Sequence, residues 1–146
     1  MRTYRFLQIF TDGGSRGNPG PSASAFVVLD ATGTVIHEEA KVLGVTTNNV
    51  AEYQAIVDAL FWISRNANLL QKESSVLVCM DSQLAYSQIV GLYKMKNARL
   101  AKLLFKIREY ESQIHTAVRY EHIPRNKNKK PDALVNKALD NRFTSS

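Results

Sequence analysis

The sequence predicts a mixed α/β fold in which helices pack against one layer of sheet. Short apolar runs separated by glycine, proline and aspartate recur in the first third of the chain, and such runs are typical of β-strands. From Val50 the apolar residues repeat every three or four positions, which indicates a helix packed on a core. Strand-like and helix-like segments alternate after that point, so the predicted order is β-β-β-α-β-α-α-β-α.

Three strands are expected first, at residues 6–11, 23–29 and 35–43. The first strand ends at Asp12-Gly13-Gly14, and the glycine- and proline-rich stretch that follows to Pro21 is typical of a loop. Asp30–Thr34 fits a short hairpin turn. These three strands should therefore form an antiparallel meander.

The rest of the chain alternates helices with two further strands. The run Val76–Met80 is apolar at every position, as expected for a strand that is buried on both faces in a parallel arrangement. Further helices are expected at residues 85–92, 100–114 and 131–139, and one more strand at 116–123. Pro131 favours a helix start, because the first N–H groups of a helix have no intrahelical partner.

The composition fits one domain. The chain has 146 residues, of which 45% are hydrophobic and 22% charged; the core is expected over residues 4–140, with a short C-terminal tail at 141–146. No apolar run approaches the ~20 residues that cross a bilayer, and the N-terminus lacks the apolar stretch and cleavage site of a signal peptide. We therefore expect a cytoplasmic monomer without a membrane partner. The lone cysteine, Cys79, excludes an internal disulfide and a Cys-rich zinc site.

The positive charge of the chain is concentrated in one segment. Residues 94–130 contain eleven Lys or Arg and three Glu, a net charge of +8, so the rest of the chain contributes −2 to the total of +6. A basic segment of this kind is typical of proteins that bind nucleic acid, although a solvated face that keeps the protein soluble has the same composition. The charge pattern therefore favours an anionic partner.

Four carboxylates stand where α/β folds often carry chemistry. Asp12 and Asp81 follow predicted strands, at the carboxyl ends where open α/β sheets bind ligands. Glu52 and Asp132 lie in the first turns of predicted helices, on faces that also carry apolar residues. Ordinary structural roles exist as well: Asp12 can close a turn, Asp81 can cap a helix, and Glu52 can form a capping box with Asn49.

The four carboxylates can converge, because two strand ends and two helix starts can meet at one corner of the sheet. Acidic groups gathered there would repel one another by several kcal/mol unless cations neutralised them. Oxygen ligands without His or Cys suit Mg²⁺ or Mn²⁺. An acidic metal site beside a basic surface favours phosphodiester chemistry, in which one ion activates water and a second stabilises the leaving oxygen.

Four segments in order resemble the motifs of type 1 ribonuclease H: Thr11–Gly20, Thr46–Glu52, Asp81–Gln83 and Asp132–Leu139. The match spans residues 10–139, nearly the whole chain. The resemblance implies a ribonuclease H-like fold, with a mixed five-stranded sheet of three antiparallel strands followed by parallel strands, and with helices on both faces. It also implies an endonuclease that cuts the RNA strand of RNA–DNA hybrids and leaves 5′-phosphate and 3′-hydroxyl ends, with duplex RNA as a further candidate ligand.

The resemblance to type 1 ribonuclease H also implies functional roles for the residues that match the family's motifs. The resemblance makes Asp12, Glu52, Asp81 and Asp132 the catalytic carboxylates that hold two Mg²⁺ or Mn²⁺ ions. It assigns Asn18, Asn48 and Gln83 to the minor groove of the hybrid, and Thr47 to a phosphate pocket for the DNA strand. Recognition should depend on shape and 2′-OH groups more than on base sequence.

The chain departs from the better-known bacterial members in two places. Residues 91–97 connect two helices directly, where those members insert a basic, hybrid-binding helix and loop. Those members also carry a mobile histidine before the last carboxylate, whereas no histidine lies between His122 and Asp132 here. His122 itself fits a hydrogen-bonded residue at a strand end. Arg125 or Lys127 could supply part of the missing role.

Two other classes of function remain open at this point. A non-catalytic module that binds hybrid or duplex RNA could keep the fold, but such a module would be expected to lose a carboxylate, and all four are present. Transposase cores and junction resolvases share the metal chemistry. The Gly-Asn-Pro-Gly loop at residues 17–20 and the Thr-Thr-Asn-Asn run at 46–49 argue against them.

Overall fold

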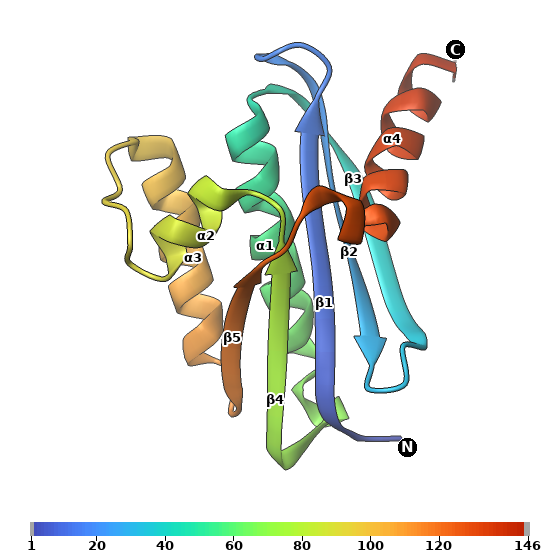
Figure 1. The fold of residues 1–146 in the computed structure, drawn as a ribbon, viewed down its shortest axis with the longest axis vertical. Coiled ribbons are helices and arrows are strands. Elements are labelled where there is room, and N and C mark those ends of the chain that lie inside the picture. The colour runs from blue at the N-terminus through green and yellow to red at the C-terminus, as the bar shows by residue number, and fades with distance from the viewer. Residues whose placement is uncertain (1, 145–146) are drawn as a thin grey trace.

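Five strands form one mixed sheet in the computed structural model, which describes residues 2–144 (Figure 1). The strands are β1 (Tyr4–Ser15), β2 (Gly20–Asp30), β3 (Val35–Thr46), β4 (Leu70–Met80) and β5 (Ala117–His122), in the spatial order β3-β2-β1-β4-β5. The pairs β1–β2 and β2–β3 are antiparallel, and β1–β4 and β4–β5 are parallel. The predicted meander followed by parallel strands is confirmed.

Helices cover both faces of the sheet, as expected (Figure 1). The four α-helices are α1 (Asn48–Arg65), α2 (Gln83–Ile89), α3 (Ala98–Ser112) and α4 (Lys129–Thr144), and two short 3-10 turns are η1 (Ala67–Leu69) and η2 (Arg125–Lys127). Helix α1 packs on β1 and β2 and is flanked by α3, whereas α4 crosses the opposite face over β1, β2 and β3. The sheet therefore lies between two helical layers of unequal size.

The larger core lies between the sheet and α1. Leu7 and Ile9 of β1 belong to the same hydrophobic cluster as Ile56 and Leu60 of α1, and all four side chains are fully buried. Each buried Leu or Ile contributes roughly 1.5–3 kcal/mol relative to exposure. The smaller cluster on the opposite face seats Val135 and Leu139 of α4 on Ala23 and Ala25 of β2. Because alanine is small, the start of α4 can approach the sheet closely.

The strands are longer than the sequence predicts. Strand β1 continues through Asp12 to Ser15, because residues 12–15 pair with residues 22–25 of β2. The predicted turn at Asp12-Gly13-Gly14 is therefore wrong, and the reversal lies at residues 16–19 instead. Helix α4 begins at Lys129, two residues before Pro131, and the expected tail is helical as far as Thr144; residues 145–146 lie outside the described part of the chain.

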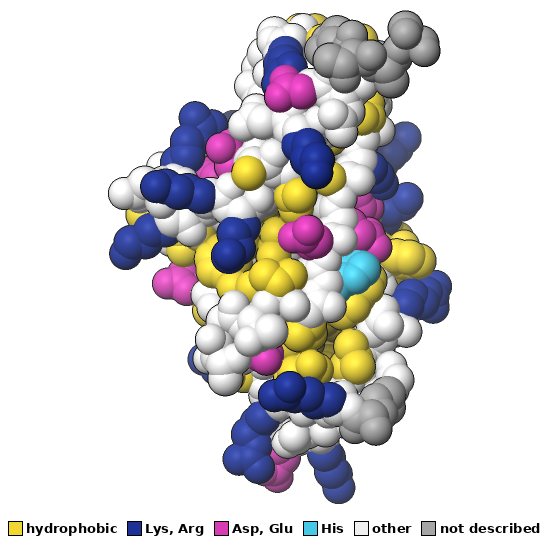
Figure 2. Space-filling view, turned by 90° about the vertical axis from the view of Figure 1, so that its right-hand side faces the viewer, with side chains coloured by type: hydrophobic (Ala, Val, Ile, Leu, Met, Phe, Trp, Pro, Cys, Tyr) yellow, Lys and Arg dark blue, Asp and Glu magenta, His cyan; other side chains and the backbone are white. Residues whose placement is uncertain are grey.

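The expected direct connection between α2 and α3 is confirmed. Residues 90–97 join α2 to α3 without another helix, so the basic protrusion is absent from this connection. Over residues 2–144, no helix is both long and apolar enough to span a bilayer. Figure 2 views the molecule from the side of α4 and β3, where hydrophobic side chains gather in the middle of the face and Lys and Arg side chains lie beside them and toward the edges.

Candidate active site

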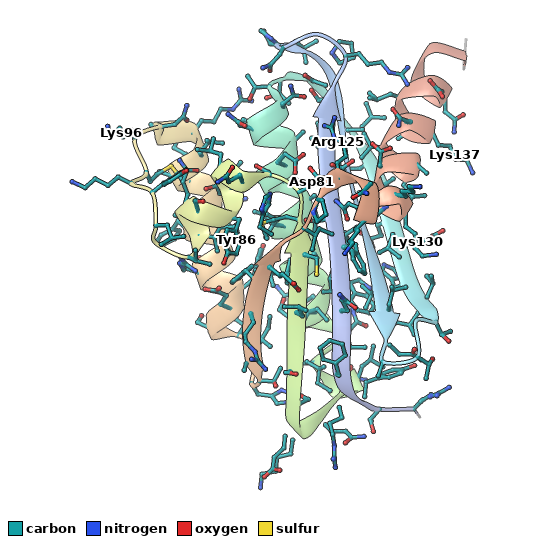
Figure 3. The ribbon with its side chains drawn as sticks, in the orientation of Figure 1. Asp81, Tyr86, Lys96, Arg125, Lys130 and Lys137 are labelled. Carbon is teal, nitrogen blue, oxygen red and sulfur yellow. The ribbon has the colours of Figure 1, made fainter. Side chains whose placement is uncertain are left out.

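Asp12 and Asp81 meet because of the parallel register. Thr11 of β1 pairs with Met80 of β4, so the next residue of each chain segment stands at the same edge of the sheet. Asp81 directly follows β4, as Figure 3 shows. The alternative role of Asp81 as a helix cap does not apply, because Ser82 caps α2 by accepting a hydrogen bond from the backbone N–H of Ala85. The Asp81 carboxylate is therefore not used as a cap.

Gly13 sets Glu52 beside Asp12. A Cβ at Gly13 would lie 2.2 Å from the backbone carbon and oxygen of Ala51 and 2.4 Å from the nitrogen of Glu52, so only glycine lets β1 and α1 touch here. The predicted capping box is wrong: Thr47 is the N-cap of α1 and accepts from the N–H of Val50 at 3.2 Å. Glu52 thus stands beyond the first turn, and its carboxylate faces the sheet edge.

Three carboxylates form one cluster. Asp12, Glu52 and Asp81 each offer an oxygen, and these atoms lie within 4.8 Å of one another. Asp12 is 5% and Glu52 7% exposed. Asp132, in the first turn of α4, borders the same cleft of about 470 Å³ but stands outside the 4.8 Å group. The structure therefore brings together three of the four predicted carboxylates and places the fourth at the wall of their cleft.

Burial and the charges of neighbouring carboxylates raise the pKa values of Asp12 and Glu52. The pKa of Asp12 rises from 3.8 to about 7, chiefly because the group is buried and then because Asp81 and Asp132 are near. Burial, followed by the charges of Asp12 and Asp81, raises the pKa of Glu52 well above 4.5. In the described residues Glu52 Oε2 is buried without a hydrogen-bond partner. An all-oxygen site of this kind fits a hard divalent cation such as Mg²⁺ or Mn²⁺.

The metal-free protein should lose stability as pH rises. Asp12 ionises near pH 4 in the unfolded chain and near pH 7 in the folded one, so the folded state holds more protons between these values and the free energy of unfolding falls across that window. Urea unfolding in EDTA at pH 4.5 to 8 should show this decline. Saturating Mg²⁺ should make this decline in the free energy of unfolding smaller. The Asp12→Asn substitution should remove much of the decline. If the wild type became more stable relative to the Asp12→Asn variant as the pH rises from 4.5 to 8, the raised pKa of Asp12 in the folded protein would be contradicted.

Asn128 is a site residue that the sequence analysis missed. Its side chain is fully buried, and Nδ2 donates to the backbone oxygen of Thr11 at 2.8 Å and to Asp81 Oδ2 at 2.9 Å. In the sequence it lies in a lysine-rich stretch that looks like a solvated loop. The one available signal was its place four residues before Asp132 and three residues before the predicted helix at 131–139.

Two predicted substrate-binding residues lock the loop after β1 to α1. Asn18 Oδ1 accepts from the backbone N–H of Asn48 at 3.0 Å, and Asn48 Oδ1 accepts from the N–H of Ser15 at 2.8 Å. The peptide bond between Asn18 and Pro19 is cis. Both amide oxygens are thus used within the fold, and the exposed side chains keep their NH₂ groups as donors. Gln83 is also exposed, at the first position of α2 beside Ser82.

Thr47 lies in a second pocket, of about 270 Å³. Asn18, Asn97 and Arg99 also border it, and Asn97 caps α3 as Thr47 caps α1. Two helix N-termini and one guanidinium therefore meet at this place, and both features favour an anion. The sequence did not indicate Arg99 for this pocket, because α1 and α3 are brought together only by their packing.

The two auxiliary candidates, Arg125 and Lys127, lie in different places in the structure. Arg125 borders the acidic cleft, whereas Lys127 borders a different pocket beside Phe10 and Leu29. His122 ends β5, where its Nε2 lies 3.3 Å from the backbone oxygen of Asp81 and its ring is tilted against Tyr86. The expected strand-end role of His122 agrees with these contacts.

Comparisons with known proteins agree on the family. The reverse transcriptase-like family model matches residues 10–138. The bifunctional protein Rv2228c of Mycobacterium tuberculosis is 40% identical over 133 residues, 90% of this chain and 35% of that protein, so the chain spans about a third of this relative. Ribonuclease HI of Halobacterium salinarum is 33% identical over 134 residues, 92% of this chain and 64% of that protein. The crystal structure of LC11-RNase H1 in complex with an RNA/DNA hybrid matches with a TM-score of 0.88 and 39% identity, covering 94% of this chain and 99% of that one.

Proposed function

The chain belongs to the reverse transcriptase-like family, as a ribonuclease H-like domain, and from this premise we propose that it is a metal-dependent endoribonuclease that hydrolyses the RNA strand of RNA–DNA hybrids. We further propose that residues 1–146 act as one domain, as a monomer in the cytoplasm, and that the products carry 5′-phosphate and 3′-hydroxyl ends. The observation that carries the proposal is the cluster of three carboxylates in one cleft, with Asp132 at its wall.

Asp12, Glu52, Asp81 and Asp132 would hold the cations. Two divalent ions bound there would supply activation of water and stabilisation of the leaving oxygen. The chain itself contributes anionic oxygens on β1, α1, the end of β4 and α4. Buried Glu52 and Asp12 are poorly solvated, which strengthens their attraction for a cation relative to carboxylates in water. The unpartnered Oε2 of Glu52 supports this assignment.

Hybrid recognition is assigned to amide donors beside the cleft. Asn18 and Asn48 have their oxygens engaged, so their NH₂ groups suit the 2′-OH oxygens and the acceptor atoms of the minor groove. Gln83 can add a donor from the start of α2. These contacts read the shape and the sugars of the duplex, which is the pattern expected for cleavage with little sequence preference.

The pocket that contains Thr47 is assigned to a phosphate of the DNA strand. The N-terminus of α1, the N-terminus of α3 and Arg99 together favour an anion there. Thr47 uses its oxygen to cap α1 and retains its hydroxyl proton as a donor. Asn49 borders both this pocket and the acidic cleft, so one duplex could engage the pocket with one strand and the carboxylates with the other.

Basic side chains stand on both sides of the site. Figure 3 shows Lys96 on the connection between α2 and α3, and Lys130 and Lys137 on α4, with Asp81 and Arg125 between them. Arg125 borders the cleft and is the better placed of the two auxiliary candidates to approach a phosphate there. Arg108 of the basic segment pairs with Glu111 on the same helix at 3.1 Å. Part of the segment's charge therefore serves structure.

A cleavage panel tests the proposal. Labelled RNA–DNA hybrid, duplex RNA and duplex DNA are incubated with the protein in Mg²⁺, Mn²⁺ or EDTA. We expect cleavage of the hybrid RNA strand only with a divalent ion, little or no cleavage of duplex DNA, and products that a phosphatase converts to 5′-hydroxyl ends. Asp81→Asn should remove the activity, and Asp58→Asn, which removes a surface ion pair with Lys41, should retain it.

The alternative function is a non-catalytic module that binds hybrid or duplex RNA. Retention of all four carboxylates in or beside one cleft favours the enzyme, because a binding module gains nothing from buried acids next to a polyanion. Hybrid binding without metal-dependent cleavage by the wild type would establish the alternative and overturn the proposed activity.

A further inference from the structure

We propose that Asn128 is a positioning residue that fixes the Asp81 carboxylate and the start of α4 for cation binding. The inference rests on the proposed metal-dependent function and adds a residue that belongs to none of the four recognisable motifs. Asn128 is 0% exposed although it sits among exposed lysines, so its side chain is directed into the protein.

The two N–H groups of the Asn128 amide connect β1 to Asp81, the residue that follows β4. One N–H donates to the backbone oxygen of Thr11, the residue before Asp12, and the other donates to Asp81 Oδ2. These two bonds account for both donors of the amide. The first ties Asn128 to β1, and the second orients the Asp81 carboxylate and leaves Oδ1 outside this contact. Asn128 therefore sets how two of the clustered carboxylates lie relative to each other.

Asn128 also fixes the fourth carboxylate. It directly precedes α4, and its backbone oxygen accepts the N–H of Asp132 at 3.4 Å. The first turn of α4, which carries Asp132, is thus anchored to the same residue that contacts Asp81. A displacement of Asn128 would move Asp132 and release Asp81 together.

The position of Asn128 directly before α4 would ordinarily make its side chain a helix cap. An asparagine at an N-cap normally accepts from the second or third N–H of the helix. Here the third helical residue is Pro131, which has no N–H, and Asn128 Oδ1 is buried without a partner among the described residues. A buried unsatisfied oxygen costs about 1–3 kcal/mol. The unsatisfied Oδ1 therefore lowers the stability of the fold locally, while the NH₂ group of Asn128 keeps its hydrogen bonds to Thr11 and Asp81.

A neutral donor suits this role. A lysine or arginine at this place would neutralise Asp81 and compete with a cation for it, whereas an amide orients the carboxylate and leaves its charge available. Groups that orient metal ligands in this way typically contribute 10- to 100-fold in metal affinity or activity.

The test compares Asn128→Ala with the wild type for Mn²⁺ alone and for hybrid cleavage. Calorimetry or electron paramagnetic resonance gives the Kd for Mn²⁺ in the absence of substrate. We expect Asn128→Ala to weaken Mn²⁺ binding by about 10- to 100-fold and to lower kcat by a similar factor, with KM for the hybrid changed less than about threefold. Asn128→Ser keeps one donor and should give intermediate values.

Thr116→Val is the matched control. It removes a hydrogen bond between Thr116 and Ser74, just before β5 begins, and neither residue borders the cleft. This variant should have a lower Tm and an unchanged Kd for Mn²⁺.

The outcomes separate the two proposals. If Asn128→Ala lowers Tm as Thr116→Val does but keeps the wild-type Kd for Mn²⁺ and the wild-type kcat, the residue is purely structural and the inference is wrong. If Asn128→Ala does not fold, as judged by circular dichroism, Asn128→Ser decides by the same criteria. Failure of the wild type to bind Mn²⁺ or cut hybrid would instead overturn the proposed function.

Discussion

Asp12→Asn should abolish hybrid cleavage and at the same time stabilise the metal-free protein. Loss of activity is expected because the substitution removes an anionic ligand from the centre of the cluster, and effects of this class reach about 10²- to 10³-fold or more. The gain in stability follows from the pKa of Asp12, which rises from 3.8 to about 7 in the fold. At 1.36 kcal/mol per pH unit, keeping this group ionised above pH 7 opposes folding by up to about 4 kcal/mol.

The measurement pairs initial cleavage rates in Mg²⁺ with urea unfolding in EDTA at pH 8. We expect a gain of roughly 1–3 kcal/mol in the free energy of unfolding, less than the upper bound because Glu52 remains buried nearby. Mg²⁺ should stabilise the wild type more than the variant. A variant that keeps wild-type activity, or that is less stable than the wild type in EDTA, would contradict the assignment of Asp12.

Asp30→Asn is the matched control, because Asp30 is a buried aspartate with the opposite environment. Its Oδ1 accepts hydrogen bonds from the N–H groups of Thr32 and Thr34, and the hydrogen bond from the Thr32 hydroxyl is the main reason that its pKa is lowered. The carboxylate is therefore favoured by the fold, and its loss should destabilise the protein while cleavage is retained. Both substitutions replace an aspartate by an asparagine. Asp12→Asn should raise the free energy of unfolding, whereas Asp30→Asn should lower it.

Gly13→Ala should have the largest effect on the fold. The new methyl group would meet the backbone of Ala51 and Glu52 at distances of 2.2 to 2.4 Å, which no rotamer change can relieve. Helix α1 must then move away from β1, which opens the larger core and displaces Glu52. Such overpacking against backbone should cost about 3 kcal/mol or more, and cleavage should be lost in the folded fraction.

Gly14→Ala provides the comparison at the next residue. A Cβ at Gly14 has Val135 Cγ1 at 3.7 Å as its nearest neighbour, an ordinary van der Waals contact. Stability should therefore change by about 1 kcal/mol or less. Urea midpoints and cleavage rates of the two variants test the close approach of α1 to β1. Equal destabilisation by the two substitutions would show that the approach is not as tight as described.

The order of elements was predictable because hydrophobic periodicity records it locally. The all-apolar run Val76–Met80 is the buried part of β4, and the three- and four-residue repeat after Val50 is the core face of α1. Element ends were less predictable. Residues 12–15 contain two glycines and look like a turn, yet they extend β1 because β2 pairs with them. Hydrogen bonds to the neighbouring strand β2 override the local turn preference of the glycines there.

The candidate site was also predictable in part: the sequence indicated the carboxylates but not the residues that position them. Motifs in order pointed to Asp12, Glu52, Asp81 and Asp132, and the fold brings three of them within 4.8 Å and the fourth to the same cleft. The capping role of Thr47 is local, since its hydroxyl accepts from the N–H of Val50 three residues later. The place of Arg99 in the pocket had no local signal, because it depends on how α1 and α3 dock. Asn128 was hidden for the same reason, since both of its partners are more than 40 residues away in the chain.

The sequence by itself determined the mixed α/β class, the family motifs and the acidic and basic partition of the chain, because side-chain type and spacing are local properties. Tertiary structure decided which groups share one small volume. The parallel register of β1 and β4, the missing side chain at Gly13 and the buried amide of Asn128 set the distances between charges. Those distances and the burial that accompanies them raise the pKa values of Asp12 and Glu52, and they make a site for cations out of carboxylates that singly could be a turn or a cap.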